Sequence, residues 1–191
     1  MRRPHPYIHA RYPDGLELVR PAGARVPVPP LPPGYTLRPC EDRDAGSWLE
    51  LFALAWPDTG ALAHIRTHAL PGGFLVVEHH ATQQLVASCV AFKPESPERH
   101  PHDGSLGWLV TDPAHARRGL AAALAATVTN RLVDEAYACP WLNTEDDRLA
   151  AIRLYLRLGW RPHLYTDGME QRWRAVFARL AEPFHPDRCV T

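Results

Sequence analysis

The chain has neither a charge imbalance nor long apolar segments. Its 191 residues include 21 Lys and Arg against 21 Asp and Glu, so the formal net charge is zero. A neutral balance gives no electrostatic basis for binding nucleic acid or an anionic membrane. No apolar run is long enough to span a bilayer, and the opening MRRPHPYIHARYPDG lacks the apolar core of a signal peptide. We therefore expect a cytoplasmic protein with no nucleic-acid or membrane partner.

Cysteine is scarce and dispersed. The chain has four cysteines and no Cys-x-x-Cys pair: Cys40, Cys89, Cys139 and Cys189. This spacing favours reduced thiols over a disulfide framework or a zinc site. The eleven histidines show no established ligand spacing. His79 and His80 are adjacent, and neighbouring residues of a strand point to opposite faces. We therefore expect no metal site.

Proline, in contrast, is abundant, and many of the 20 prolines lie near the N-terminus. The run VPVPPLPPG, Val26 to Gly34, can form neither a helix nor a central strand and favours a polyproline-like linker. Before it, a short strand is expected at Leu16 to Val19. We predict a Pro-rich arm over residues 1–34, packed along the surface or partly disordered, and a single domain over residues 35–191.

The remainder alternates strand and helix patterns. Strands are predicted at residues 35–38, 74–78, 85–92, 106–111, 137–143 and 160–165. Helices are predicted at residues 45–55, 61–69, 119–136, from the acidic turn at 144–147 to Gly159, and at 169–180. The strand at 85–92 is nearly all apolar or small, as expected of a strand covered on both faces. The order predicts a mixed α/β domain.

The stretch from Leu106 to Ala125, LGWLVTDPAHARRGLAAALA, joins an apolar strand to a helix through a basic turn. The first amides of a helix have no partner within it and carry partial positive charge, so a phosphate can bind there. Gly119 removes a side chain where the anion approaches, and Arg117 and Arg118 add charge. The alternative is that both arginines are simply solvated.

Two segments resemble signatures of the GNAT superfamily of acyl-CoA-dependent N-acyltransferases. Ala116 to Ala121 resembles the pyrophosphate motif Arg/Gln-x-x-Gly-x-Gly/Ala, except that Ala116 replaces its first residue. The segment LNTEDDRLAAIRLYLRLGW resembles Asn-x-x-Ala-x-x-Leu-Tyr-x-x-x-Gly-Phe, with Arg148 in place of Asn. The matching residues of the second motif are Ala151, Leu154, Tyr155, Gly159 and Trp160.

The resemblance implies a GNAT-type mixed, mostly antiparallel central sheet, splayed at the cofactor site and flanked by helices. It also implies acetyl-CoA as cosubstrate. The backbone of β-strand residues Leu109, Val110 and Thr111 would hold the pantetheine and polarise the acyl carbonyl. The pyrophosphate would be held by Arg117, Arg118, Gly119, Leu120 and Ala121.

The same resemblance implies direct attack by a primary amine, on a small molecule or a peptide, in a ternary complex. Tyr155 would protonate the departing thiolate, since a phenol with a pKa of about 10 is protonated at neutral pH. Its alternative role is a core tyrosine. The cysteines lie outside both motifs, which makes a covalent acyl-enzyme less attractive.

Several questions stay open at this point. The general base is not identified, and its candidates are Glu78, His102, Asp103, Glu145 and Asp146. The helix at 169–180 replaces a strand found in many family members. The chain could also be a non-catalytic acyl-CoA sensor, given Ala116, Arg148 and the missing base. A third alternative is an interaction module that uses the Pro-rich arm, including for homodimerisation.

Overall fold

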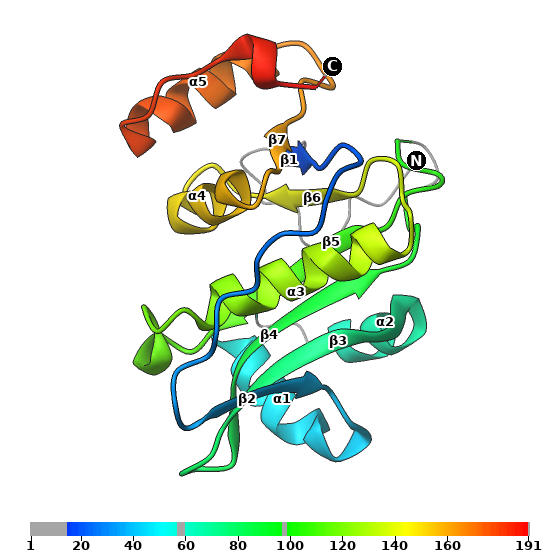
Figure 1. Cartoon of the computed structure of the whole chain (residues 1–191), viewed down its shortest axis with the longest axis vertical. Coiled ribbons are helices and arrows are strands. Elements are labelled where there is room, and N and C mark those ends of the chain that lie inside the picture. The colour runs from blue at the N-terminus through cyan, green and yellow to red at the C-terminus, as the bar shows by residue number, and fades with distance from the viewer. Residues whose placement is uncertain (1–14, 57–59, 97–98, 191) are drawn as a thin grey trace. The chain divides into compact units, whose positions relative to one another are not determined.

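The computed structural model describes residues 15–56, 60–96 and 99–190. They form a mixed α/β structure with mostly antiparallel strands (Figure 1). The chain divides into two compact units: a larger unit of residues 22–140, and a smaller unit of residues 1–21 and 141–191. None of the described helices combines the length and apolar composition needed to cross a membrane.

The larger unit is built on four antiparallel strands in the order β2-β3-β4-β5. Their bounds are Tyr35–Pro39 for β2, Ala69–His79 for β3, Gln84–Phe92 for β4 and Ser105–Thr111 for β5. All residues of β4 after Gln84 are buried, which confirms the prediction of a strand covered on both faces. β3 begins earlier than predicted, because an irregular pairing between Ala69 and Phe74 carries the strand through the Pro-Gly-Gly sequence.

Helices cover both faces of these strands. α1 (Ala45–Ala53) and α2 (Ala61–His68) lie on one face, and α3 (Leu120–Asp134) lies on the other (Figure 1). The face under α1 and α2 is filled by Trp48, Phe52, Ile65, Val90 and Phe92, all buried. α3 buries the predicted apolar stripe, which consists of Leu120, Leu124, Val128 and Leu132. These two layers hold β5 and the start of α3 in place.

The segment before β2 is fixed on α3. The backbone N–H of Val26 donates to Asn130 Oδ1 at 2.7 Å, and Asn130 Nδ2 donates to the Val26 carbonyl at 2.9 Å. Arg25 pairs with Asp134 at 2.6 Å. Residues 26–34 form neither helix nor strand, as predicted. In the remainder of the predicted arm, residues 22–25 belong to the larger unit, residues 15–21 with β1 belong to the smaller unit, and residues 1–14 lie outside the described residues.

The smaller unit contains three antiparallel strands in the order β6-β1-β7 and two helices. The strands are β1 (Leu16–Val19), β6 (Trp141–Thr144) and β7 (Arg161–Pro162), and the helices are α4 (Leu149–Arg157) and α5 (Met169–Leu180). α5 has the predicted bounds. β6 is shorter than predicted, because Cys139 donates its N–H to Asp103 Oδ1 at 2.8 Å and Pro140 has no N–H to donate.

The acidic turn before α4 does not form the first turn of the helix, contrary to the prediction. α4 begins at Leu149, with Arg148 at its N-cap. Glu145 pairs with Arg148 at 2.6 Å, and Asp146 pairs with Arg172 of α5 at 2.5 Å. An ion pair with arginine, reinforced by hydrogen bonds, holds each carboxylate outside the helix.

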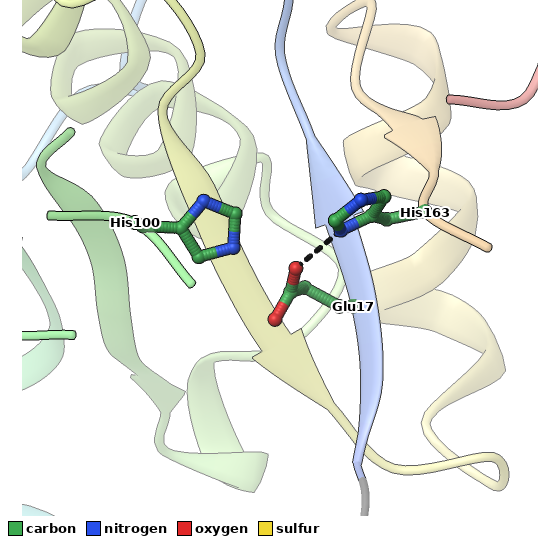
Figure 2. A group of neighbouring side chains, drawn as sticks. All are labelled: Glu17, His100 and His163. Atoms are coloured by element: carbon green, nitrogen blue, oxygen red, sulfur yellow. Dashed lines mark hydrogen bonds and ion pairs between the residues drawn. The ribbon is translucent and has the colours of Figure 1, made fainter. Parts of the chain in front are cut away.

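A buried carboxylate interrupts the apolar sequence of β1. Glu17 has no exposed surface, and its Oε1 lies 2.5 Å from Nδ1 of His163 (Figure 2). The backbone N–H of His163 also donates to the Glu17 carbonyl, at 3.0 Å. The imidazole gives the buried carboxylate a partner and fixes the chain after β7 to β1. His100, also drawn in Figure 2, belongs to the larger unit, where its N–H donates to the Ser96 carbonyl at 2.9 Å.

One charged network ties β2 to the start of α1 and to β3. Arg38 makes a bidentate contact with Asp44, at 2.6 and 2.9 Å, and contacts Glu78 at 2.6 Å. The N–H of Glu41 also donates to Asp44 Oδ2 at 2.7 Å. The hydrogen bonds from Arg38 hold the pKa of Asp44 below its usual range, against the opposing effect of burial. The ionised carboxylate therefore stabilises the folded state.

Replacing Asp44 by asparagine is expected to lower the free energy of unfolding by about 2 kcal/mol near neutral pH, since hydrogen bonds to charged groups contribute about that much. The pKa of Asp44 is lower in the folded chain than in the unfolded one. Its contribution is therefore complete above the ordinary Asp pKa of about 3.9 and is lost as pH falls through the folded value. Urea unfolding of both proteins should show the difference shrinking below about pH 4.

The matched control is Asp42→Asn, because the Asp42 side chain is 99% exposed and makes only a surface pair with Arg66. This variant should leave the free energy of unfolding almost unchanged at both pH values. A penalty for Asp44→Asn that stays constant down to pH 3 would show that the charge of Asp44 is not what stabilises the network.

Candidate functional site

β5 carries a bulge at the predicted acyl-binding positions. Between the pairs that Gly107 and Val110 make with β4, two residues of β5, Trp108 and Leu109, face the single residue Cys89. Trp108 has a φ of 54°, a left-handed conformation that a regular strand does not contain. The bulge takes the backbone around Leu109 out of the regular ladder. The sequence prediction placed the binding groups here but missed the bulge, whose signal is the glycine inside the strand.

Aromatic side chains surround the bulge on the face covered by α1 and α2. The Trp108 ring lies 5.1 Å from Phe52 and 5.2 Å from Trp56, measured between ring centroids. Phe52 in turn stacks on Trp48 at 4.6 Å. Trp108 and Trp56 are only partly buried. The bulge is therefore bordered by partly exposed aromatic surface.

The turn between β5 and α3 is anchored at two points. Asp112 donates its N–H to the Val86 carbonyl at 2.8 Å, and its Oδ1 accepts from the Ala114 N–H at 2.8 Å. Three residues later, His115 Nδ1 is hydrogen-bonded to the Tyr35 hydroxyl at 2.9 Å. These contacts fix the path of the chain as it enters α3.

The N-terminus of α3 is open. Its N-cap, Gly119, has a φ of 81°, and no side chain caps the helix. A Cβ added at Gly119 would have no atom within 4 Å. Arg117 and Arg118 are exposed, and neither has an ion-pair partner among residues 15–56, 60–96 and 99–190. The unpartnered amides of Leu120 and Ala121 thus border open space with two cations beside it, which is the composition of a phosphate site.

Thr111, at the end of β5, offers a further polar group. Its Oγ1 is buried and has no hydrogen-bond partner among the described residues. Buried hydroxyls are normally hydrogen-bonded, so an orphaned one suits contact with a ligand. Leu109, Val110, Thr111 and the start of α3 all belong to the larger unit. The structure therefore brings together the predicted pantetheine and pyrophosphate residues, and the orphaned hydroxyl and open helix end fit such a ligand.

Tyr155, the predicted proton donor, lies in α4 of the smaller unit. Its side chain is buried, and its ring lies 6.5 Å from that of Trp160 in an edge-to-face arrangement. Gly159 ends the helix with a φ of 83°, and an added Cβ there would lie 2.7 Å from Arg20. The helix end of the second motif thus needs its glycine. The catalytic role of Tyr155 stays a prediction.

The model of the acetyltransferase (GNAT) family matches residues 39–160, which include β5, the open end of α3 and α4. This chain belongs to the GNAT acetyltransferase family. The predicted family is thereby confirmed, and the mixed, mostly antiparallel sheet confirms the predicted fold class.

One protein of known sequence and two of known structure are similar to this GNAT chain. It is 36% identical over 138 residues to a mycothiol acetyltransferase of Acidimicrobium ferrooxidans, covering 67% of this chain and 43% of that protein. A GCN5-related N-acetyltransferase from Sphaerobacter thermophilus has the same fold, with a TM-score of 0.61 and 20% identity over 77% of this chain and 47% of that one. The chain thus spans less than half the length of both relatives.

A second solved structure matches over most of its own length. An aminoglycoside 6'-N-acetyltransferase from Acinetobacter baumannii has a TM-score of 0.53 and 22% identity, and the match covers 66% of this chain and 90% of that one. At this identity the likeness concerns the fold alone.

One pair beside the start of β5 was not among the residues predicted from the sequence. His64 of α2 places its Nε2 3.1 Å from Oε2 of Glu95, which follows β4 in the chain. Ser105, the first residue of β5, donates its hydroxyl to the other oxygen of Glu95 at 3.0 Å. Thirty-one positions separate His64 from Glu95, so no local sequence pattern predicts this contact.

Proposed function

We propose that this chain is an acyl-CoA-dependent N-acyltransferase that uses acetyl-CoA as its cosubstrate. The observation that carries the proposal is the uncapped N-terminus of α3 at Gly119, directly after the bulged strand β5, within the part of the chain that matches the family. Acetyl-CoA supplies an acyl group already activated as a thioester. The residues described below bind and orient it.

Different residues of the chain bind the pyrophosphate, hold the pantetheine and protonate the departing sulfur. The amides of Leu120 and Ala121 and the open space at Gly119 accept the pyrophosphate, with Arg117 and Arg118 adding charge from its flanks. Backbone groups of Leu109, Val110 and Thr111 hold the pantetheine, and one of their amides polarises the acyl carbonyl. Tyr155 donates its phenolic proton to the departing sulfur.

Direct transfer within a ternary complex is supported by the state of the cysteines. A cysteine must form a thiolate to act as a nucleophile. Burial raises the pKa of Cys40 to about 12 and also raises the pKa of Cys89 and of Cys189. These three thiols are therefore protonated at neutral pH and unsuited to carry the acyl group.

The acceptor is a primary amine on a small molecule or a peptide. The relative named as a mycothiol acetyltransferase favours the small molecule. Partly exposed Trp56 and Trp108 beside the bulge favour an acceptor with an apolar or aromatic portion. Homodimerisation, a cytoplasmic location and the absence of a metal site stay predictions.

The test is titration calorimetry with acetyl-CoA followed by measurement of thiol release with a panel of primary amines. We expect saturable binding of acetyl-CoA and amine-dependent release of one thiol per acetyl group transferred. Binding without thiol release for any amine would favour the non-catalytic sensor instead. Well-folded protein that binds neither acetyl-CoA nor longer acyl-CoAs would contradict both functions.

A further inference from the structure

We propose that His64, oriented by Glu95, is the general base that takes a proton from the acceptor ammonium. This inference rests on the proposed function. An alkylammonium has no lone pair with which to attack a carbonyl, so the reaction needs a proton acceptor beside the acyl group. The sequence offered candidate bases but did not show where any of them lies in the fold.

Four of those five candidates have structural partners instead. Glu78 is held by Arg38, and Asp103 accepts a hydrogen bond from the backbone of the loop before β6. In the smaller unit, Glu145 pairs with Arg148 and Asp146 with Arg172. A carboxylate paired with a guanidinium or a backbone amide is a poor base, because its partner stabilises the charged form. A neutral imidazole, which has no such stabilised charge, fits the role better.

The contact with Glu95 sets which nitrogen of His64 is basic. Glu95 is acceptor-only when ionised, so Nε2 of His64 carries the hydrogen in their 3.1 Å contact. Ser105 donates to the second oxygen of Glu95 and fixes the carboxylate. The neutral imidazole then presents Nδ1 as an acceptor, and this atom has no partner in the part of the chain that the structure describes. The His64 side chain is 39% exposed and can therefore receive a proton from a ligand.

The neighbours of His64 hold the ring without competing for Nδ1. The His68 ring stacks on it at 4.2 Å with an interplanar angle of 23°, and Nδ1 of His68 contacts the backbone carbonyl of His64 at 2.9 Å. The N–H of Lys93, at the end of β4, donates to the His68 carbonyl at 2.9 Å. Among the described residues, Glu95 and His68 are thus the titratable groups that contact the imidazole, while Arg66, also on α2, pairs with Asp42 at 3.0 Å.

The position of His64 relative to the bulge follows from Phe92. The His64 and Phe92 rings lie 5.9 Å apart. Phe92 also packs beside Gly107, where an added Cβ would lie 2.9 Å from Phe92 Cε2. Leu109 is two residues further along β5. Phe92 thus neighbours both the imidazole and the residue that precedes the bulge, and the proposal needs the acceptor nitrogen and one water molecule to complete the path to His64.

The groups named above account for every proton that moves in the transfer step. One N–H bond of the ammonium breaks, its proton goes to Nδ1 of His64, and the electron pair left on nitrogen forms the new bond to the acyl carbon. Glu95 stabilises the resulting imidazolium through Nε2. The C–S bond breaks as Tyr155 gives its proton to sulfur, and a second proton from nitrogen restores the phenol through water. His64 then releases its proton, so the reaction yields amide, thiol and one free proton.

The test compares His64→Gln with His80→Gln, a change at an exposed histidine of the larger unit whose Nε2 contacts Thr36 Oγ1 at 2.7 Å and which has no part in the proposed base. The readout is kcat/KM for an amine that the wild type acetylates, measured by thiol release across pH. We expect His64→Gln to lower kcat/KM about 100-fold at neutral pH, the usual contribution of general base catalysis. The loss should shrink as pH approaches the pKa of the amine, because the free amine needs no base. His80→Gln should change kcat/KM less than about twofold, and both variants should keep the affinity for acetyl-CoA within about twofold of the wild type.

A second readout does not depend on the acceptor. A proton–nitrogen correlation spectrum of the imidazoles, recorded at alkaline pH, should show for His64 the tautomer with hydrogen on Nε2, and Glu95→Gln should weaken that preference. Hydrogen on Nδ1, an equal loss of kcat/KM at every pH, or the same loss in His80→Gln would overturn the base. Turnover by the wild type with unchanged kinetics in His64→Gln would refute the base alone. Absence of turnover by the wild type would refute the proposed function and the base with it.

Discussion

Gly119→Glu is expected to weaken acetyl-CoA binding by about 100-fold or more. The new carboxylate would occupy the space in front of α3 where the pyrophosphate binds, and it would accept the hydrogen bonds of the first amides itself. Losing two hydrogen bonds to a charged group costs about 3 kcal/mol or more, and each 1.4 kcal/mol is about tenfold in affinity. Titration calorimetry with acetyl-CoA measures the change directly.

The chain offers a close control for this variant. Gly168 is the N-cap of α5 with a φ of 82°, against 81° for Gly119, and neither position has an atom within 4 Å of an added Cβ. Gly168→Glu therefore imposes the same backbone strain and the same charge at a helix N-terminus, but outside the proposed site. It should bind acetyl-CoA as the wild type does. Equal affinity for Gly119→Glu and Gly168→Glu would rule out the pyrophosphate site at α3.

The Gly119→Ala variant distinguishes the effect of backbone strain from the effect of a charged side chain in the proposed phosphate-binding space. It adds a Cβ at a left-handed position, which costs roughly 1 kcal/mol of stability, but it carries no charge and meets no neighbour. We infer that most of the affinity survives in this variant. The contrast between alanine and glutamate at one position thus reports on the phosphate rather than on the fold of the turn.

The elements that carry the proposed pyrophosphate site could be predicted because their signals are local. β5 is a short apolar run, the basic turn follows at once, and α3 opens at a glycine and repeats leucine or valine every four residues. α5 was predicted with its observed bounds for the same reason, since Trp173, Val176, Phe177 and Leu180 follow the helical period and are all buried.

The predicted boundaries of helices and strands were wrong where a contact with a residue far away in the sequence opposed the local preference. The acidic residues before α4 would suit the first turn of a helix, but Arg172, 26 positions from Asp146, draws that carboxylate into an ion pair. The Pro-Gly-Gly sequence after α2 signals a break, yet pairing with β4 carries β3 through it. Propensity decides such positions only when no tertiary contact opposes it.

The contacts between residues far apart in the sequence could not be predicted from it. His64 and Glu95 meet because α2 packs on the face that β4 and β5 present, and a single sequence has no pattern for that meeting. The bulge at Trp108 depends similarly on the register of β5 against β4. The sequence predicted the proposed cosubstrate site, whereas the proposed base and the shape of the strand needed the fold.

Tyr155→Phe is expected to lower kcat about 100-fold while leaving the affinity for acetyl-CoA unchanged. Phenylalanine keeps the ring that lies against Trp160 but removes the proton that sulfur would receive, and general acid catalysis contributes about this factor. An interaction made only as the thiolate departs affects kcat rather than binding. Thiol release with a saturating amine, together with calorimetry, separates the two quantities.

The control for Tyr155 is another tyrosine of the smaller unit whose hydroxyl has a structural bond. Tyr165 donates its hydroxyl to the Gly15 carbonyl at 2.8 Å, so Tyr165→Phe removes a hydrogen bond worth about 1 kcal/mol without touching α4. It should lower the melting temperature by a few degrees and leave kcat unchanged. If Tyr155→Phe instead lowers stability and acetyl-CoA affinity together with no separate fall in kcat, the phenol is a core residue and the thiolate takes its proton from another donor.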